Sequence, residues 1–142
     1  MKRDEFHPIL RVPPHSVEAE ASILSALLLD GEAIHRVRIE PDLFYSSFNR
    51  AVYTAILKLA SVGQGVDTIT VFESLSGSDV DDGNLLPQLN ALAQFVPSAA
   101  NLHRYVEIVR EKALLRAMIA ASDELTTNAF NPKNEKTPAQ LL

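Results

Sequence analysis

The chain has 142 residues, which suits one domain built around a single core. Apolar residues make up 46% of the sequence and charged residues 22%, a balance that excludes a wholly disordered protein. The net charge of −5 argues against direct nucleic-acid binding, because phosphate contacts need clustered lysine and arginine.

The sequence contains no cysteine, which excludes disulfides and thiolate metal sites. The longest apolar stretch near the start, residues 23–29, is interrupted by Ser25 and follows two glutamates, so it resembles neither a signal peptide nor a membrane span. We therefore expect a cytoplasmic protein without membrane contact.

Residues 1–14 mix charged side chains with three prolines, and we interpret them as a flexible arm. Ser16 then offers an N-cap for a helix that Asp30-Gly31 ends, with Glu18 and Glu20 in the first turns, where the helix dipole favours negative charge. Apolar residues at three- and four-residue steps predict that this helix faces the core. They are Val17, Ala21, Leu24 and Leu28, with Ile23 and Leu27 widening the stripe.

Further helices are predicted along the next part of the chain. A short helix is expected at 32–37, and Pro41 marks a second start because proline suits the first helical position. A long helix is predicted over 46–62, ended by Gly63. Asp67 or Thr68 can cap a short helix after it, and another helix begins near residue 85 and stops before Pro97.

From residue 98 to 129 no glycine or proline intervenes, which predicts one helix of roughly 45 Å at 1.5 Å per residue. A turn and a new cap at Thr137-Pro138 follow. We therefore predict an all-α fold: a helical globular subdomain over 15–97, and then, over 98–142, a first hairpin helix, a turn and the truncated start of a second hairpin helix.

The long helix is apolar on more than one side. One stripe comprises Leu102, Val106, Val109, Ala113, Ala117 and Ala120. A second stripe faces another direction and comprises Tyr105, Ile108, Leu115 and Ile119, while side chains such as Met118 and Leu125 fill much of the rest. Either an intermolecular contact covers the second side, or the alanines simply favour helix and the missing part of the last helix supplies the cover. The interface candidates are Tyr105, Ile108, Leu115, Met118, Ile119 and Leu125.

The chain lacks the motifs that would carry chemistry. None of its five glycines begins the GxxxxGK[ST] run that cradles nucleotide phosphates. The four histidines are too scattered for a zinc site, and the paired acids have simpler roles at helix starts, in a loop or on a helix surface. Arg104, Arg110, Lys112 and Arg116 alternate with glutamates, which favours a salt-bridged surface over a phosphate contact. We expect no enzyme activity, no cofactor and no metal in this chain.

Four ordered segments are distinctive: residues 12–20 (Val-Pro-Pro-His-Ser-Val-Glu-Ala-Glu), 42–45 (Asp-Leu-Phe-Tyr), 65–70 (Gly-Val-Asp-Thr-Ile-Thr) and 96–102, followed by Tyr105 and 108–113. In these segments the chain resembles the amino-terminal domain of DnaB-family replicative DNA helicases. Each segment also has a structural explanation as a stop, a cap or a helix start, so we interpret them as fold determinants. They do not resemble catalytic residues.

The resemblance implies a helical globule followed by a helical hairpin. In that family the hairpins pair between subunits, giving the hexameric ring a collar that recruits primase and, in some systems, contacts a helicase loader. The expected partners are therefore other copies of the domain, primase and, as in some systems of the family, a loader. ATP and Mg²⁺ are implied only for the motor domain, which this chain lacks. The alternative is a stand-alone, for example phage-encoded, mimic that binds and regulates a host helicase.

Overall fold

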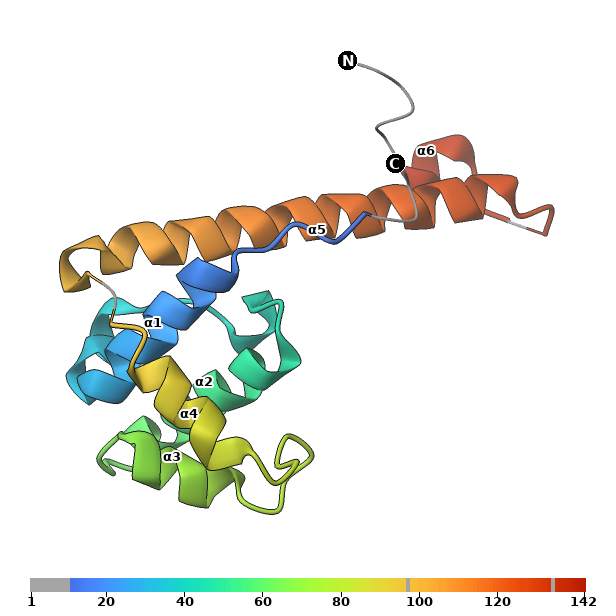
Figure 1. Cartoon of the computed structure of the whole chain (residues 1–142). Coiled ribbons are helices and arrows are strands. Elements are labelled where there is room, and N and C mark those ends of the chain that lie inside the picture. The colour runs from blue at the N-terminus through green and yellow to red at the C-terminus, as the bar shows by residue number, and fades with distance from the viewer. Residues whose placement is uncertain (1–10, 97, 134) are drawn as a thin grey trace. The chain divides into compact units, whose positions relative to one another are not determined.

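The computed structural model describes residues 11–96, 98–133 and 135–142, and these residues form helices and turns without any strand (Figure 1). The all-α prediction is confirmed. The elements are α1 (Val17–Leu29), η3 (Gly31–Arg36), η4 (Pro41–Leu43), α2 (Ser47–Ser61), α3 (Thr68–Leu75), α4 (Leu85–Ala93), η5 (Ala99–Asn101), α5 (Leu102–Phe130) and α6 (Pro138–Leu141), where η denotes a 3₁₀ helix. Within these residues, no helix combines the length and the hydrophobicity needed to cross a membrane.

The chain divides into two compact units. The first, His15–Ala113, is the globular unit. The second contains, within the described residues, 11–14 and Leu114–Leu142. The predicted flexible arm lies partly in residues 1–10, outside the described part of the chain.

Helix α1 is the centre of the globular unit and contacts η3, α2 and α4. Ser16 caps it as expected, since its side chain accepts a hydrogen bond from the Ala19 N–H at 3.1 Å. Ile23, Leu24 and Leu27 are fully buried. Val17 was predicted to lie in this core face, but 62% of its surface is exposed. Helical side chains lean toward the N-terminus, so the side chain of this first residue extends past the end of the helix and away from the core.

The predicted long helix over 46–62 is confirmed as α2. The Ser46 hydroxyl caps it by accepting a hydrogen bond from the Asn49 N–H at 3.2 Å. The helix ends in a Schellman motif: Gly63, at φ 72°, donates its N–H to Ala60, and Gln64 donates to Leu59. A left-handed residue is needed at this position, which explains the glycine. The helix predicted to begin at Pro41 is only the single 3₁₀ turn η4. The extended backbone of Phe44 ends this turn and separates it from α2.

The two following helices, α3 and α4, complete one side of the core. Asp67 and Thr70 form a reciprocal capping box at the start of α3, with hydrogen bonds of 2.8 and 2.9 Å. Leu85 and Leu89 of α4 are buried, and α4 packs on both α1 and α3. These helices match the predicted positions.

Helix α5 is the long helix that the sequence predicts, with 29 residues and therefore a length of about 43 Å. Its first three turns belong to the globular unit, since Leu102, Val106 and Val109 join the core cluster. The compact unit accordingly extends to Ala113, beyond the 15–97 range expected for the globular subdomain. Beyond α5 comes α6, which begins with a capping box between Thr137 and Gln140.

Candidate interaction surface

Helix α5 has a buried face in its first half and an exposed apolar face in its second. The buried residues Leu102, Val106, Val109 and Ala113 follow three- and four-residue steps, as the first predicted stripe requires. Ala117 and Ala120, which the same prediction places in that stripe, are exposed. The apolar periodicity therefore continues past Ala113, whereas the buried stretch of the stripe ends at that residue.

The six predicted interface residues fall into two groups. Tyr105 and Ile108 are half-buried and pack against the core of the globular unit, so they stabilise the fold, and an interface role for them stays a prediction. The other four lie in the second half of α5. Leu115, Met118 and Ile119 expose 43%, 57% and 48% of their surface, and Leu125 is partly exposed.

Leu114 belongs with the four predicted interface residues in the second half of α5. Leu114 is 63% exposed and lies four residues before Met118, on the same face of the helix. Its spacing from Met118 and Leu125 is the signal that identifies it from sequence. We call Leu114, Leu115, Met118, Ile119 and Leu125 the α5 apolar face.

The charged side chains of α5 form ion pairs along the first half of the helix. Arg104 lies 3.3 Å from a Glu107 carboxylate oxygen and 3.2 Å from one of Glu111. The predicted salt-bridged surface is confirmed for Arg104. Arg116 instead donates a hydrogen bond of 2.7 Å to the Pro14 carbonyl, within the second unit. Its guanidinium thereby holds the end of the amino-terminal segment against α5.

Sequence reasoning missed the role of Glu20. We expected this side chain to interact with the α1 dipole, yet it is only 2% exposed. Its carboxylate accepts hydrogen bonds from the Tyr45 N–H at 2.8 Å, the Ser46 N–H at 3.3 Å and the Asn49 side-chain amide at 3.0 Å. A carboxylate at the start of α2 satisfies backbone donors that the helix leaves unpaired and interacts favourably with its dipole.

The distinctive sequence segments meet in the fold. Glu20, from segment 12–20, binds the end of segment 42–45, and the His15 ring stacks on Tyr45 with centroids 4.2 Å apart. Ser25 of α1 joins another segment to the core: its hydroxyl accepts a hydrogen bond from the Val96 N–H at 3.1 Å and donates one to the Ala93 carbonyl at 3.3 Å. These contacts support the interpretation of the segments as fold determinants.

Among the described residues, the buried titratable side chain of Tyr53 has a structural role. No three histidine, aspartate or glutamate side chains in that part of the chain gather in a way that could hold a metal ion. Burial raises the pKa of the Tyr53 phenol above its ordinary value of 10.0. That phenol donates a hydrogen bond of 3.0 Å to the Ile39 carbonyl, deep in the globular unit. Tyr53 therefore serves as a core residue with a satisfied hydroxyl.

Comparison with known proteins gives one consistent result. Residues 12–111 match the family model of the DnaB-like helicase N-terminal domain. The chain is 33% identical over 128 residues to the replicative DNA helicase DnaB of Geobacillus stearothermophilus, and 36% identical over 125 residues to that of Rhodothermus marinus. These matches cover 88% and 86% of this chain but only 28% and 13% of the respective helicases.

A solved structure agrees with this comparison over most of the fold. The crystal structure of the N-terminal domain of DnaB helicase from Mycobacterium tuberculosis superposes with a TM-score of 0.75 at 35% identity, covering 84% of this chain and 89% of that one. The matched region of these helicases is their N-terminal domain. The chain therefore belongs to the DnaB-like helicase N-terminal domain family, and its fold is all-helical like that of the solved domain.

Proposed function

We propose that this domain supports subunit association and partner docking in a replicative helicase ring, and that the α5 apolar face is the surface that does so. The observation that carries the proposal is the exposure of four large apolar side chains, Leu114, Leu115, Met118 and Ile119, over two turns of one helix. Burying each of them would contribute about 1.5–3 kcal/mol. A contiguous apolar surface of this kind marks a protein interface more often than a solvated helix.

The family gives the surface its proposed partners. A second copy of the domain would cover the α5 apolar face in the ring collar, and primase or a helicase loader would dock on the assembled collar. The net charge of −5 supports docking of proteins and argues against direct binding of DNA. ATP hydrolysis and unwinding would belong to the motor domain of the assembled helicase, and the assembly would act in the bacterial cytoplasm.

Two measurements test this proposal. Light scattering over a range of protein concentrations should show a mass that rises with concentration, because association follows mass action. Titration with the helicase-binding domain of a cognate primase should give saturable binding. A strictly monomeric protein that binds no primase domain would contradict the proposal.

A further inference from the structure

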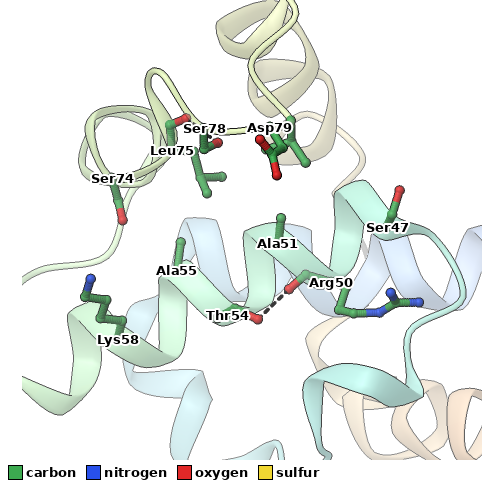
Figure 2. Close-up of a pocket in the computed structure, with 11 residues that line it drawn as sticks. Ser47, Arg50, Ala51, Thr54, Ala55, Lys58, Ser74, Leu75, Ser78 and Asp79 are labelled. Atoms are coloured by element: carbon green, nitrogen blue, oxygen red, sulfur yellow. Dashed lines mark hydrogen bonds between the residues drawn. The ribbon is translucent and has the colours of Figure 1, made fainter.

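Apolar surface in the two units differs in what lies next to it. In the globular unit, a groove of about 460 Å³ lies between α2 and the end of α3, and Figure 2 shows Ala51 and Ala55 at its floor, pointing toward Leu75. Ala55 and Leu75 are only 4% and 8% exposed, so this floor belongs to the core of the globular unit. In the second unit the α5 apolar face is exposed, and another segment of the same unit runs beside it.

That segment is the end of the amino-terminal arm, by which we mean residues 1–14. Its described part, residues 11–14, forms one compact unit with Leu114–Leu142, and Figure 1 shows it in blue beside α5, running in the opposite direction. The Arg116 guanidinium donates its hydrogen bond of 2.7 Å to the Pro14 carbonyl. The preceding proline keeps this backbone extended. Arg116 therefore fixes the point at which the arm meets the helix.

The anchor point lies at one edge of the α5 apolar face. Ile119 follows Arg116 by three residues and Leu115 precedes Ile119 by four, so these side chains are neighbours on the helix surface. Leu115 and Ile119 are 43% and 48% exposed. Leu114 and Met118, which lie farther around the helix from Arg116, are 63% and 57% exposed. The arm thus meets α5 beside the less exposed edge of the face.

The sequence and the reach of the arm suit this edge. Residues 6–10 read Phe-His-Pro-Ile-Leu and so bring three large apolar side chains close together. Leu10 precedes Pro14 by four residues, and an extended chain of that length spans at most about 14 Å. Leu125 follows Arg116 by nine residues, which is about 13 Å along the helix. An arm that continues along α5 therefore carries apolar side chains over the length of the face.

The arm is a cover that a partner can displace. Arg11, Val12 and Pro13 are exposed, so the described part of the arm buries little surface of its own. Holding an extended segment in one conformation costs backbone entropy, which opposes the few contacts that the arm makes. A second copy of the domain would bury a much larger apolar surface on α5 and would compete for the same edge.

We propose that the amino-terminal arm covers the Leu115–Ile119 edge of the α5 apolar face in the unassociated chain and is displaced when a second copy docks there. Ile9 and Leu10 supply the apolar contact, and Arg116 anchors the arm. This competition rests on the proposed docking role of the α5 apolar face. Its effect is to weaken self-association, because only the molecules whose face is uncovered can dock.

A spin label on the arm tests the contact directly. The chain has no cysteine, so Glu5→Cys creates a single attachment site. In the dilute ¹⁵N-labelled whole chain, the label should broaden the amide signals of residues 115–125 more than those of α2 and α3, and Arg116→Ala should reduce this broadening. Signals of residues 115–125 that stay sharp would overturn the proposal. So would broadening seen only when label and ¹⁵N are on different molecules, since a second copy would then be the cover.

Light scattering over a concentration series tests the competition. Leu10→Asp and Arg116→Ala should each strengthen self-association about fourfold, as expected if the arm covers the face in about half of the molecules and both copies must uncover it. His7→Asp adds a negative charge to the arm without removing an apolar side chain, and Arg110→Ala removes another exposed arginine of α5. Both controls should associate like the wild type. Unchanged or weaker association of Leu10→Asp and Arg116→Ala, with the fold checked by circular dichroism, would overturn the competition.

The two measurements separate this inference from the proposed function. The broadening is measured on the unassociated chain and needs no partner. Self-association without broadening would overturn the arm contact and leave the docking role of the α5 apolar face standing. Broadening without self-association or primase binding in any variant would contradict the docking role, and the competition with it.

Discussion

Replacing Glu20 by alanine should be among the most destabilising single changes in the globular unit. The substitution removes three hydrogen bonds to a buried carboxylate and leaves the Tyr45 and Ser46 amides without their acceptor. Bonds to charged acceptors contribute about 1.5–3 kcal/mol each, and an unsatisfied buried donor costs about 1–3 kcal/mol. Because these contributions are not additive and the Ser46 bond is long, at 3.3 Å, we expect a loss of about 3–5 kcal/mol in the free energy of unfolding.

Urea unfolding followed by circular dichroism measures this loss. Glu18→Ala is the matched control, because Glu18 is exposed on the first turn of the same helix and should cost less than about 1 kcal/mol. Glu20→Gln keeps one acceptor oxygen and should fall between the two. If Glu20→Ala destabilised the protein no more than Glu18→Ala, the carboxylate would not be fixing the start of α2 and our reasoning would be wrong.

Three further predictions concern the same unit. Tyr53→Phe should lower the free energy of unfolding in urea by about 1–2 kcal/mol, because the Ile39 carbonyl loses its hydrogen-bond donor. Since folding raises the pKa of the phenol, the stability of the wild type should be constant below the ordinary pKa of 10.0 and fall as the pH rises above it. If the Tyr53→Phe variant lost stability with the same slope at high pH, the phenol would not be buried. Ser25→Ala should cost about 1–3 kcal/mol by breaking its bonds to Ala93 and Val96, and a neutral result would show that α1 does not hold the segment after α4. Val96 is a β-branched residue in the left-handed region, at φ 49°, and is 69% exposed. Val96→Gly should therefore raise the free energy of unfolding by about 0.5–1 kcal/mol by relieving backbone strain. A lower free energy of unfolding in this variant would exclude strain at this position.

The parts of the fold that could be predicted are those that local chemistry determines. Ser16 and Asp67 each lie at a cap that the sequence indicates, because a side-chain oxygen next to the first helical turn needs no information from elsewhere in the chain. Gly63 ends α2 for the same local reason.

The parts that could not be predicted depend on tertiary contacts. The burial of Glu20 requires α2 to begin beside α1, which no periodicity in α1 reveals. Tyr105 and Leu115 look alike in sequence, since both lie on the second stripe of the long helix, but Tyr105 packs against the core cluster, whereas Leu115 is 43% exposed. Periodicity identifies which residues share a face and does not show how far along a helix the covering elements extend.

The α5 apolar face is tested most directly by adding a charge to it. Met118→Asp places a carboxylate at an exposed site in the centre of this face, and Thr127→Asp adds the same charge at an exposed position elsewhere on the helix. Light scattering over a concentration series should show that Met118→Asp weakens self-association at least tenfold, while Thr127→Asp associates like the wild type. Urea unfolding should show that both variants are about as stable as the wild type. Equal association of Met118→Asp and wild type would contradict a docking role for this face.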